Sequence, residues 1–338
     1  MAMAIKAASL LAANQRTRPD CPGHHLMSTF ALTRLAGVFP VLPTPFDEAM
    51  QTDTAGLQVL VRYLLQSGVD GITYPGVASE VSHLSEPERV QLTAMVLKEV
   101  AGRVPVIAGV SSTDLPMTLR LASSAVAQGA AALMVAAPAN LQGTQAQVAH
   151  FSAIAQALPG TAIMLQNVPA PAGAGLEPEA LLEILAAVPA VRYIKEETLP
   201  SGQRLSAVSA NAPASLVGVF GGAGGRYITD ELRRGACGTM PAIELAEVHV
   251  ALFAAHRRGD AAAVRRIFAR MLPVLNIQAV FRWSLTKHVL HRRGLIACDL
   301  QRAPGPRLDA LDRQDVDAFL DDMDDLLLPQ AVIDDLRR

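Results

Sequence analysis

Short apolar runs that carry Val and Ile alternate with helical stretches of 10 to 15 residues between about residues 37 and 241. Runs of this length are typical of strands, and the stretches between them repeat their apolar positions with helical spacing. The eight predicted strands are 37–43, 71–75, 104–110, 131–137, 162–167, 191–195, 215–220 and 236–240. This alternation predicts consecutive βα units around a parallel sheet.

Glycines mark the ends of the first predicted helices, which cover 53–66, 86–100 and 115–128. Gly68, Gly102 and Gly129 follow them, at the position where a helix commonly ends in a left-handed residue. Eight βα units in about 210 residues indicate an α/β fold, a closed (β/α)8 TIM barrel. A doubly wound open sheet is the alternative, but it usually has fewer strands and a glycine fingerprint after the first one, which this sequence lacks.

The pattern becomes purely helical after about residue 242. It predicts a last barrel helix and a C-terminal helical extension, with helices over 244–258, 261–271, 274–293 and 314–328. We therefore divide the chain into an N-terminal extension (1–34), a barrel core (35–242) and C-terminal helices (243–338). A short apolar stretch followed by Arg, Pro and His residues predicts that the extension is disordered, with Met27 as an alternative start.

Composition narrows the function classes. The 338 residues are 51% hydrophobic and 18% charged, with a formal net charge of -2, so a nucleic-acid partner is not expected. No apolar run reaches the roughly 20 residues that would cross a membrane. Cys21, Cys237 and Cys298 are odd in number and widely spaced, which predicts a reducing, cytoplasmic location and neither a disulfide framework nor a zinc site.

Four histidines lie on predicted C-terminal helices. They are His249, His256, His288 and His291, and none has metal-ligand spacing to a cysteine or carboxylate. We expect them at the surface or at an interface, and we expect no metal.

Lys195 is the strongest catalytic candidate. It ends the sixth apolar run, and the active site of a TIM barrel lies at the C-terminal ends of its strands. Burial disfavours an ammonium group, so a lysine there is a candidate Schiff-base nucleophile. Strand alternation puts Glu197 on the same side as Lys195 and Glu196 on the other. Glu197 is therefore either a catalytic base or a counter-ion that compensates a buried lysine.

Further strand-end residues are candidates for substrate binding. They are Thr44, Gly76, Ala78, Ser79, Gln166, Asn167, Gly221 and Gly222. The turn 76–80 is expected to hold a carboxylate through its N–H groups and hydroxyl, unless it is only a tight turn before a helix. Thr44 and Asn167 each have an ordinary turn or loop role as the alternative. The glycine run after the seventh strand allows close approach to a substrate, with phosphate binding as the alternative.

Several ordered motifs resemble one enzyme family. They are GVFPVLPTPF, GVASE, VPVIAGVSS, QNVP, YIKEET and LTK, and together they resemble the dihydrodipicolinate synthase / N-acetylneuraminate lyase family over about residues 36–300. The resemblance implies a class I aldolase-type lyase on a (β/α)8 barrel with C-terminal helices. It also implies an imine between Lys195 and a small 2-keto acid, no cofactor, and a homotetramer.

Departures from the family pattern narrow the reaction. The family's proton-shuttle tyrosine falls at Ala139, and Gln166 replaces a second tyrosine. Carbon–carbon cleavage needs that proton transfer, whereas elimination of water needs only a base at C3. GVASE, QNVPAP, KEET and GGAGGR resemble the L-2-keto-3-deoxyarabonate dehydratases, which implies a hydro-lyase of pentose catabolism that yields 2-oxoglutarate semialdehyde.

Three other functions stay open. They are a 1-pyrroline-4-hydroxy-2-carboxylate deaminase, a 2-keto-3-deoxy acid aldolase, and a non-catalytic barrel that binds 2-keto acids. The retained Lys195 argues against the last of these.

Overall fold

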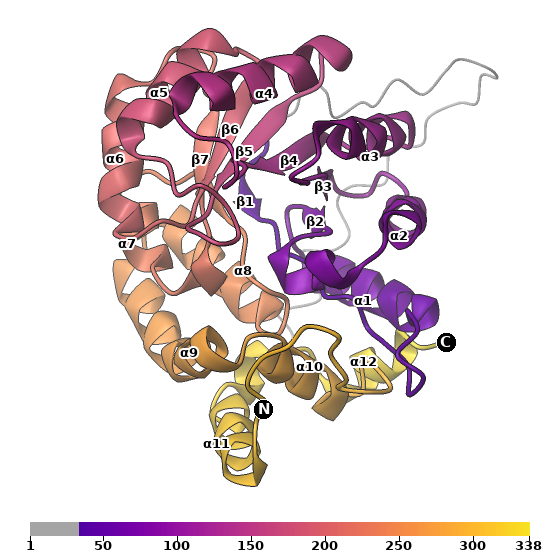
Figure 1. Cartoon of the computed structure of the whole chain (residues 1–338). Coiled ribbons are helices and arrows are strands. Elements are labelled where there is room, and N and C mark those ends of the chain that lie inside the picture. Colours follow the sequence, from indigo (N-terminus) through magenta and orange to yellow (C-terminus); the bar gives the residue numbers. More distant parts are fainter. Residues whose placement is uncertain (1–33) are drawn as a thin grey trace, which may run out of the picture.

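The computed structural model describes residues 34–338, and its strands form one eight-stranded parallel sheet (Figure 1). The strands are β1 (Gly37–Val38), β2 (Ile72–Tyr74), β3 (Val106–Gly109), β4 (Ala132–Ala136), β5 (Ile163–Asn167), β6 (Val191–Glu196), β7 (Gly218–Gly221) and β8 (Gly238–Thr239). β1 pairs with β8, and a parallel bridge from Val41 to Thr73 joins the residues after β1 to β2. The sheet therefore closes, which confirms the predicted barrel and excludes the open doubly wound sheet.

Helices follow the strands and cover the outside of the barrel. They are α1 (Thr54–Gln66), α2 (Glu86–Val100), α3 (Leu115–Ala127), α4 (Thr144–Ala157), α5 (Pro178–Ala187), α6 (Ser201–Asn211), α7 (Ile228–Arg233) and α8 (Ala246–Arg257). The Asp53 side chain caps α1 by accepting a hydrogen bond from the N–H of Gly56. Gly68, Gly102 and Gly129 have φ of 77°, 70° and 92°, so the predicted glycine ends of α1, α2 and α3 are confirmed.

The C-terminal extension differs from its prediction at two places. It consists of α9 (Ala261–Phe281), α10 (Trp283–Arg292), α11 (Ala310–Asp321) and α12 (Gln330–Asp335). A break before residue 274 was expected, but α9 runs through Pro273 and ends at Arg282 instead. The buried neighbours Met271, Val274 and Leu275 hold this part of α9 against the core, which outweighs the loss of one helical hydrogen bond at proline. The helix expected over 314–328 ends at Asp321, and α12 was not foreseen.

Side chains fill the interior of the barrel. Phe39, Tyr193 and Phe220 pack edge to face, with ring centroids 5.4 Å (Phe39–Phe220) and 6.1 Å (Tyr193–Phe220) apart. Met134 and Met164 belong to the same inner cluster, while two larger clusters lie between the sheet and the helices. Because the inside is packed, a ligand has to bind at the mouth of the barrel.

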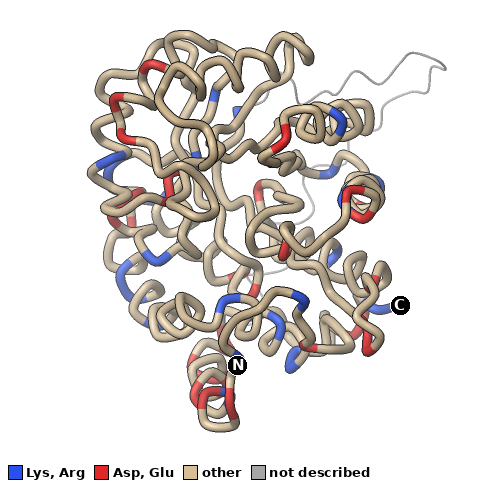
Figure 2. Tube along the Cα trace, in the orientation of Figure 1, with Lys and Arg blue, Asp and Glu red and all other residues tan. Residues whose placement is uncertain are grey.

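Charged residues of both signs lie interspersed over the outer helices, as Figure 2 shows. Acidic residues gather on α11, and no broad basic face is seen in this view. Among the described residues, no helix has the length and apolar character to cross a membrane.

Candidate active site

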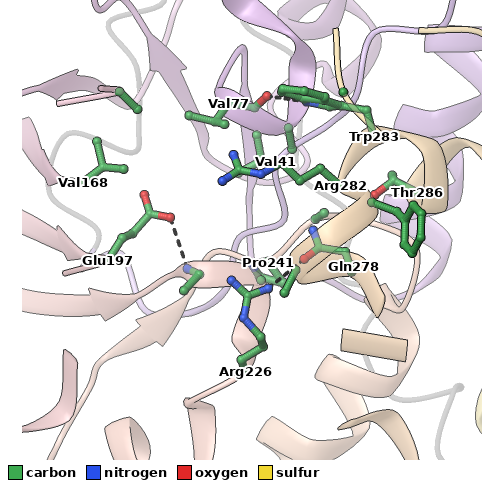
Figure 3. A pocket seen from close by; sticks show the side chains of 18 of the residues that line it. Val41, Val77, Val168, Glu197, Arg226, Pro241, Gln278, Arg282, Trp283 and Thr286 are labelled. Atoms are coloured by element: carbon green, nitrogen blue, oxygen red, sulfur yellow. Dashed lines mark hydrogen bonds between the residues drawn. The ribbon is translucent and has the colours of Figure 1, made fainter. Parts of the chain in front are cut away.

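A cavity of about 540 Å³ opens at the C-terminal ends of the strands (Figure 3). The turn after β2, the loops after β5 and β7, strand β6 and the junction of α9 with α10 all contribute to its wall. Its polar and charged lining includes Lys195, Glu197, Arg226, Gln278, Arg282 and Thr286. Of the residues predicted to form the site, Ala78, Lys195 and Glu197 lie in this wall.

Lys195 and Glu197 form an ion pair at the cavity. The Nζ atom of Lys195 lies 3.0 Å from Oε1 of Glu197, and Lys195 is only 4% exposed. Glu196 points to the opposite side of β6, where its carboxylate accepts hydrogen bonds from the side-chain amide of Asn167. The alternation expected from strand geometry is therefore confirmed for these residues.

The carboxylate of Glu197 is held on both oxygens. Gln166 donates to Oε1 through Nε2 at 2.7 Å, and the N–H of Ala223 donates to Oε2 at 3.1 Å. Burial alone would raise the pKa of Glu197, but the Lys195 ammonium and these donors together lower it below its usual value. Glu197 is thus a carboxylate at neutral pH, oriented toward the lysine.

Gly222 makes room for Glu197. A Cβ atom at position 222 would lie 2.4 Å from Cγ of Glu197, closer than non-bonded carbons approach. Gly222 therefore acts at the site through the space that it leaves for Glu197, whereas the prediction for the glycine run was close approach to a substrate.

The turn after β2 is a short 3₁₀ helix, Val77–Ser79. The hydroxyl of Ser79 forms its hydrogen bonds with the backbone and does not point into the cavity. Ser79 Oγ accepts a hydrogen bond from the N–H of Gly76 at 2.8 Å and donates to the carbonyl of Leu42. Ser79 is fully buried and lies outside the cavity wall, whereas Val77 and Ala78 line it. The N–H groups of Val77 and Ala78 start the turn and have no acceptor among the described residues. Anion binding at this turn therefore falls to the backbone.

Two other predicted side chains lie behind the wall. The Thr44 hydroxyl pairs with the Tyr74 hydroxyl at 3.0 Å and donates to the Ser79 carbonyl at 2.9 Å. Asn167 donates to the Leu176 carbonyl at 2.9 Å and accepts from its N–H at 2.8 Å, which shapes the loop after β5. Both side chains are fully buried, and neither lines the cavity.

Gly76 and Gly221 do not line the cavity either. A Cβ at Gly76 would meet Val41, which is part of the cavity wall, at 2.7 Å, and one at Gly221 would meet Oε2 of Glu231 at 1.9 Å. These glycines therefore allow close packing against Val41 and Glu231. Burial raises the pKa of Glu231 to about 7, although Ser201 donates a hydrogen bond to it.

The cavity also contains residues that the sequence pattern did not reveal. Arg226 donates to Oε1 of Gln278 at 2.9 Å, and Trp283 donates from Nε1 to the Val77 carbonyl at 2.8 Å. Arg226 directly follows the glycine run after the seventh strand, so its place in the sequence could have indicated that it lies at the cavity. Gln278, Arg282 and Trp283 come from the junction of α9 and α10, which only tertiary packing brings to the barrel mouth.

No tyrosine lines the cavity. The chain has four, all in the described part: Tyr63, Tyr74, Tyr193 and Tyr227. Ala139, which occupies the position of the family's tyrosine, is exposed and lies outside the cavity wall. None of the four tyrosines takes over the place of that phenol in the cavity lining.

The expectation that all four histidines are at the surface or an interface was wrong for two of them. His249 is 1% exposed, with Nδ1 2.8 Å from the Leu245 carbonyl, and burial lowers its pKa to about 4. His288 is buried on α10, with Nε2 2.9 Å from Oδ1 of Asp317. Both face inward because α8 and α10 pack on the core. His256 is half-buried and His291 is exposed.

A closed (β/α)8 barrel with a buried lysine at the end of β6 and a cavity at that end defines a class I aldolase-like lyase. The chain belongs to the Dihydrodipicolinate synthetase family, which it matches over residues 34–323.

Individual relatives agree with this membership. L-2-keto-3-deoxyarabonate dehydratase of Azospirillum brasilense is 28% identical over 309 residues, which cover 90% of this chain and 100% of the relative. 4-Hydroxy-tetrahydrodipicolinate synthase of Bacillus subtilis is 38% identical over 154 residues, so the match spans 45% of this chain and about half (53%) of that relative. The crystal structure of dihydrodipicolinate synthase from Rhodopseudomonas palustris superposes with a TM-score of 0.79 at 25% identity, over 85% of this chain and 97% of that one.

Proposed function

We propose that the protein is a Schiff-base hydro-lyase that removes water from a 2-keto-3-deoxy sugar acid. The observation that carries this proposal is the 3.0 Å pair of Lys195 and Glu197 in a cavity that no tyrosine lines. For the substrate we propose L-2-keto-3-deoxyarabonate, converted to 2-oxoglutarate semialdehyde in pentose catabolism. The relative from Azospirillum brasilense, matched over its whole length, supports this choice.

The first step in the proposal is imine formation. The substrate carboxylate binds the free N–H groups of Val77 and Ala78, which brings the C2 carbonyl to Lys195. The Lys195 ammonium gives a proton to Glu197, and its amine attacks C2. Loss of the C2 oxygen as water leaves a protonated imine, and no cofactor is needed.

The second step is elimination. The protonated imine acidifies C3, and Glu197, again a carboxylate after returning its proton to the departing water, removes the C3 proton. The resulting enamine expels the C4 hydroxyl, which takes the proton from Glu197 and leaves as water. The conjugated imine that results has a C3=C4 double bond and a C5 hydroxyl. It loses a proton from C5 and gains one at C3, which leaves an enol that tautomerises to the C5 aldehyde. Hydrolysis of this imine then frees Lys195 and releases 2-oxoglutarate semialdehyde. Gln166 and Ala223 support Glu197 in these steps by fixing both of its oxygens.

The other predicted site residues have supporting roles in this proposal. Ser79 and Gly76 fix the carboxylate-binding turn, and Gly222 admits Glu197. Thr44 is joined to the same turn through the Ser79 carbonyl. Asn167 and Gly221 support the wall from behind.

Borohydride trapping tests the imine. Incubation with pyruvate and reductant is expected to add the reduced pyruvate mass to the peptide that contains Lys195, and Lys195→Arg is expected to abolish the adduct. Absence of an adduct in the wild-type protein would refute the Schiff base and favour the non-catalytic barrel.

Product analysis tests the reaction. Semialdehyde formation is measured with C5 and C6 2-keto-3-deoxy acids and with 1-pyrroline-4-hydroxy-2-carboxylate. Release of pyruvate instead would identify an aldolase, and turnover of the pyrroline alone would identify the deaminase. Glu197→Gln is expected to lower kcat by about 10²–10⁴-fold, as loss of a general base does. Unchanged turnover would leave Glu197 as a counter-ion only.

We also propose a homotetramer and a cytoplasmic location. The family resemblance supports the first, and the scattered cysteines support the second. Light scattering of the purified protein and fractionation of cells test them.

A further inference from the structure

A second buried carboxyl group lies directly behind the cavity wall. Glu244 comes two residues after the segment 240–242, which lines the cavity beyond β8, and it is only 2% exposed. Thr286, on α10, lines the cavity and donates a hydrogen bond from its hydroxyl to Oε2 of Glu244 at 3.0 Å. Thr286 and Glu197 lie on opposite sides of the cavity in Figure 3. The Thr286 hydroxyl therefore connects a carboxyl outside the lining with the space inside it.

The surroundings of Glu244 suit it to proton exchange. No ion pair within residues 34–338 includes Glu244, and the guanidinium of Arg226 donates to Oε1 of Gln278 at 2.9 Å instead. Burial raises the pKa of Glu244 to about 7, although the Thr286 hydroxyl and the charge of Arg226 act to lower it. A carboxyl group with a pKa near neutral pH can both accept and return a proton, as a general acid–base catalyst must.

Thr286 presents an acceptor to the cavity. A threonine hydroxyl has one proton, and its donation to Glu244 leaves the lone pairs of the oxygen for a ligand. A neighbouring base activates such a hydroxyl, because it takes the hydroxyl proton while the oxygen receives another. Thr286 and Glu244 together are therefore able to take a proton from a bound molecule.

The proposed reaction needs a base at a carbon remote from Lys195. Glu197, which lies 3.0 Å from the Lys195 amine, serves C3 and the C4 hydroxyl. After water has left, the conjugated imine must also lose a proton from C5, the carbon of the substrate furthest from the lysine. A base on the wall opposite Glu197 is placed to reach that end of the substrate.

We propose that Thr286 and Glu244 form a second acid–base couple, which moves a proton from C5 to C3 once water has left. The C5 proton passes to the Thr286 oxygen while the hydroxyl proton passes to Oε2 of Glu244. The C5–H electron pair forms the C4=C5 bond, the C3=C4 pair shifts to C2=C3, and the imine pair moves to the Lys195 nitrogen. The couple then returns a proton to C3 by the same route, which restores the imine and the Glu244 carboxylate and leaves the enol.

Thr286 contacts the substrate in this step, and Glu244 acts through it as a positioning residue. The inference rests on the proposed function, which supplies the imine at Lys195.

Product analysis of Glu244→Gln and Thr286→Val tests the couple. Each variant is given 2-keto-3-deoxypentonate and, separately, 5-hydroxy-2-oxopent-3-enoate, the unsaturated acid that forms when only water is lost. Both variants are expected to dehydrate the pentonate but to release the unsaturated acid, which proton NMR identifies by its vinyl signals. Their kcat for conversion of the added unsaturated acid to the semialdehyde is expected to fall at least about 10²-fold, as loss of a general base does. Thr286→Ser keeps the hydroxyl and is expected to restore semialdehyde formation.

Glu231→Gln is the matched control. Glu231 is also buried, burial raises its pKa to about 7, and it accepts a hydrogen bond from the Ser201 hydroxyl at 2.7 Å. Neither Glu231 nor Ser201 lines the cavity. Glu231→Gln is therefore expected to form the semialdehyde without releasing the unsaturated acid. A purely structural role of Glu244 would slow dehydration and isomerisation together and would leave the product unchanged.

Three results would overturn the couple: isomerisation of the unsaturated acid at the wild-type rate in E244Q or T286V, an equal loss in E231Q, or no isomerisation by the wild-type protein. Circular dichroism establishes that the variants are folded, and either E244Q or T286V alone decides the question if the other unfolds. Failure of the proposed function gives a separate result. A wild-type protein that isomerises the unsaturated acid but forms no semialdehyde from the pentonate would refute the dehydration and leave the couple in place.

Discussion

Lys287 and Glu80 form a buried ion pair between α10 and the turn after β2. The Nζ atom of Lys287 lies 2.5 Å from Oε1 of Glu80, and both side chains are fully inaccessible to solvent. Lys287 also donates to the Leu300 carbonyl at 2.6 Å and lies 4.1 Å from the ring centre of Phe46. The N–H of Ala303 donates to the other oxygen of Glu80 at 2.6 Å. Lys287→Met therefore leaves Glu80 buried with a single hydrogen bond.

The expected loss of stability is large. Removing one partner of a buried ion pair costs about 3–5 kcal/mol, because the remaining charge loses its counter-ion and stays desolvated. Natural domains are stable by only about 5–15 kcal/mol, so this loss is a substantial part of the total. The double variant K287M/E80Q removes both charges, and the glutamine oxygen still accepts from Ala303. The free energy of unfolding of the double variant is expected to be at least about 2 kcal/mol higher than the value obtained by adding the losses of the two single variants.

Urea unfolding at pH 7, followed by circular dichroism, gives the free energies for this double-mutant cycle. Lys98→Met is the control, because Lys98 is exposed on α2 and makes no ion pair among the described residues; it is expected to change stability by less than about 0.5 kcal/mol. A loss below about 1 kcal/mol in K287M, or additive single changes, would refute the reasoning. K287M is also expected to raise KM, since Glu80 ends the turn that holds the substrate carboxylate.

Three further outcomes are expected. Gly222→Ala pushes Glu197 away, because its Cβ would lie 2.4 Å from Cγ, and should lower kcat by about 10²-fold in steady-state assays; normal kcat would contradict this. Burial raises the pKa of Glu231 to about 7, so its contribution to stability falls as pH rises from about 4.5 to about 7. The fall amounts to up to about 3 kcal/mol in the free energy of unfolding, and Glu231→Gln should abolish it, as measured by urea midpoints at pH 5 and pH 8. The same loss of stability between these pH values in the variant would exclude Glu231 as its source. Trp283→Phe removes the 2.8 Å bond to Val77, and should cost about 1 kcal/mol and raise KM, whereas an unchanged KM would separate Trp283 from the turn.

The barrel was predictable because its signals are local. The strands are short apolar runs, and capping residues or left-handed glycines mark the ends of α1, α2 and α3, so alternation along the chain was enough to count eight βα units. The pairing of Lys195 with Glu197 also follows from the sequence, since strand alternation puts residues two apart on the same side.

Other features of the site depend on packing between distant segments. The sequence pattern put Ser79 in the pocket, but its hydroxyl bonds to Leu42, which lies 37 positions away in the chain. It expected a break at Pro273, whereas contacts of α9 with the core keep that helix whole and move the break to Arg282.

By itself, the sequence determined the barrel, the strand-six lysine with its carboxylate neighbour, and the absence of a phenol at position 139. Only the tertiary structure decided which side chains face the cavity, because that depends on contacts between residues far apart in the chain. The junction of α9 and α10 reaches the barrel mouth by packing, and it brings Arg282 beside Arg226. No local sequence pattern predicts this contact, because each of the two segments by itself has the pattern of an ordinary surface helix or loop.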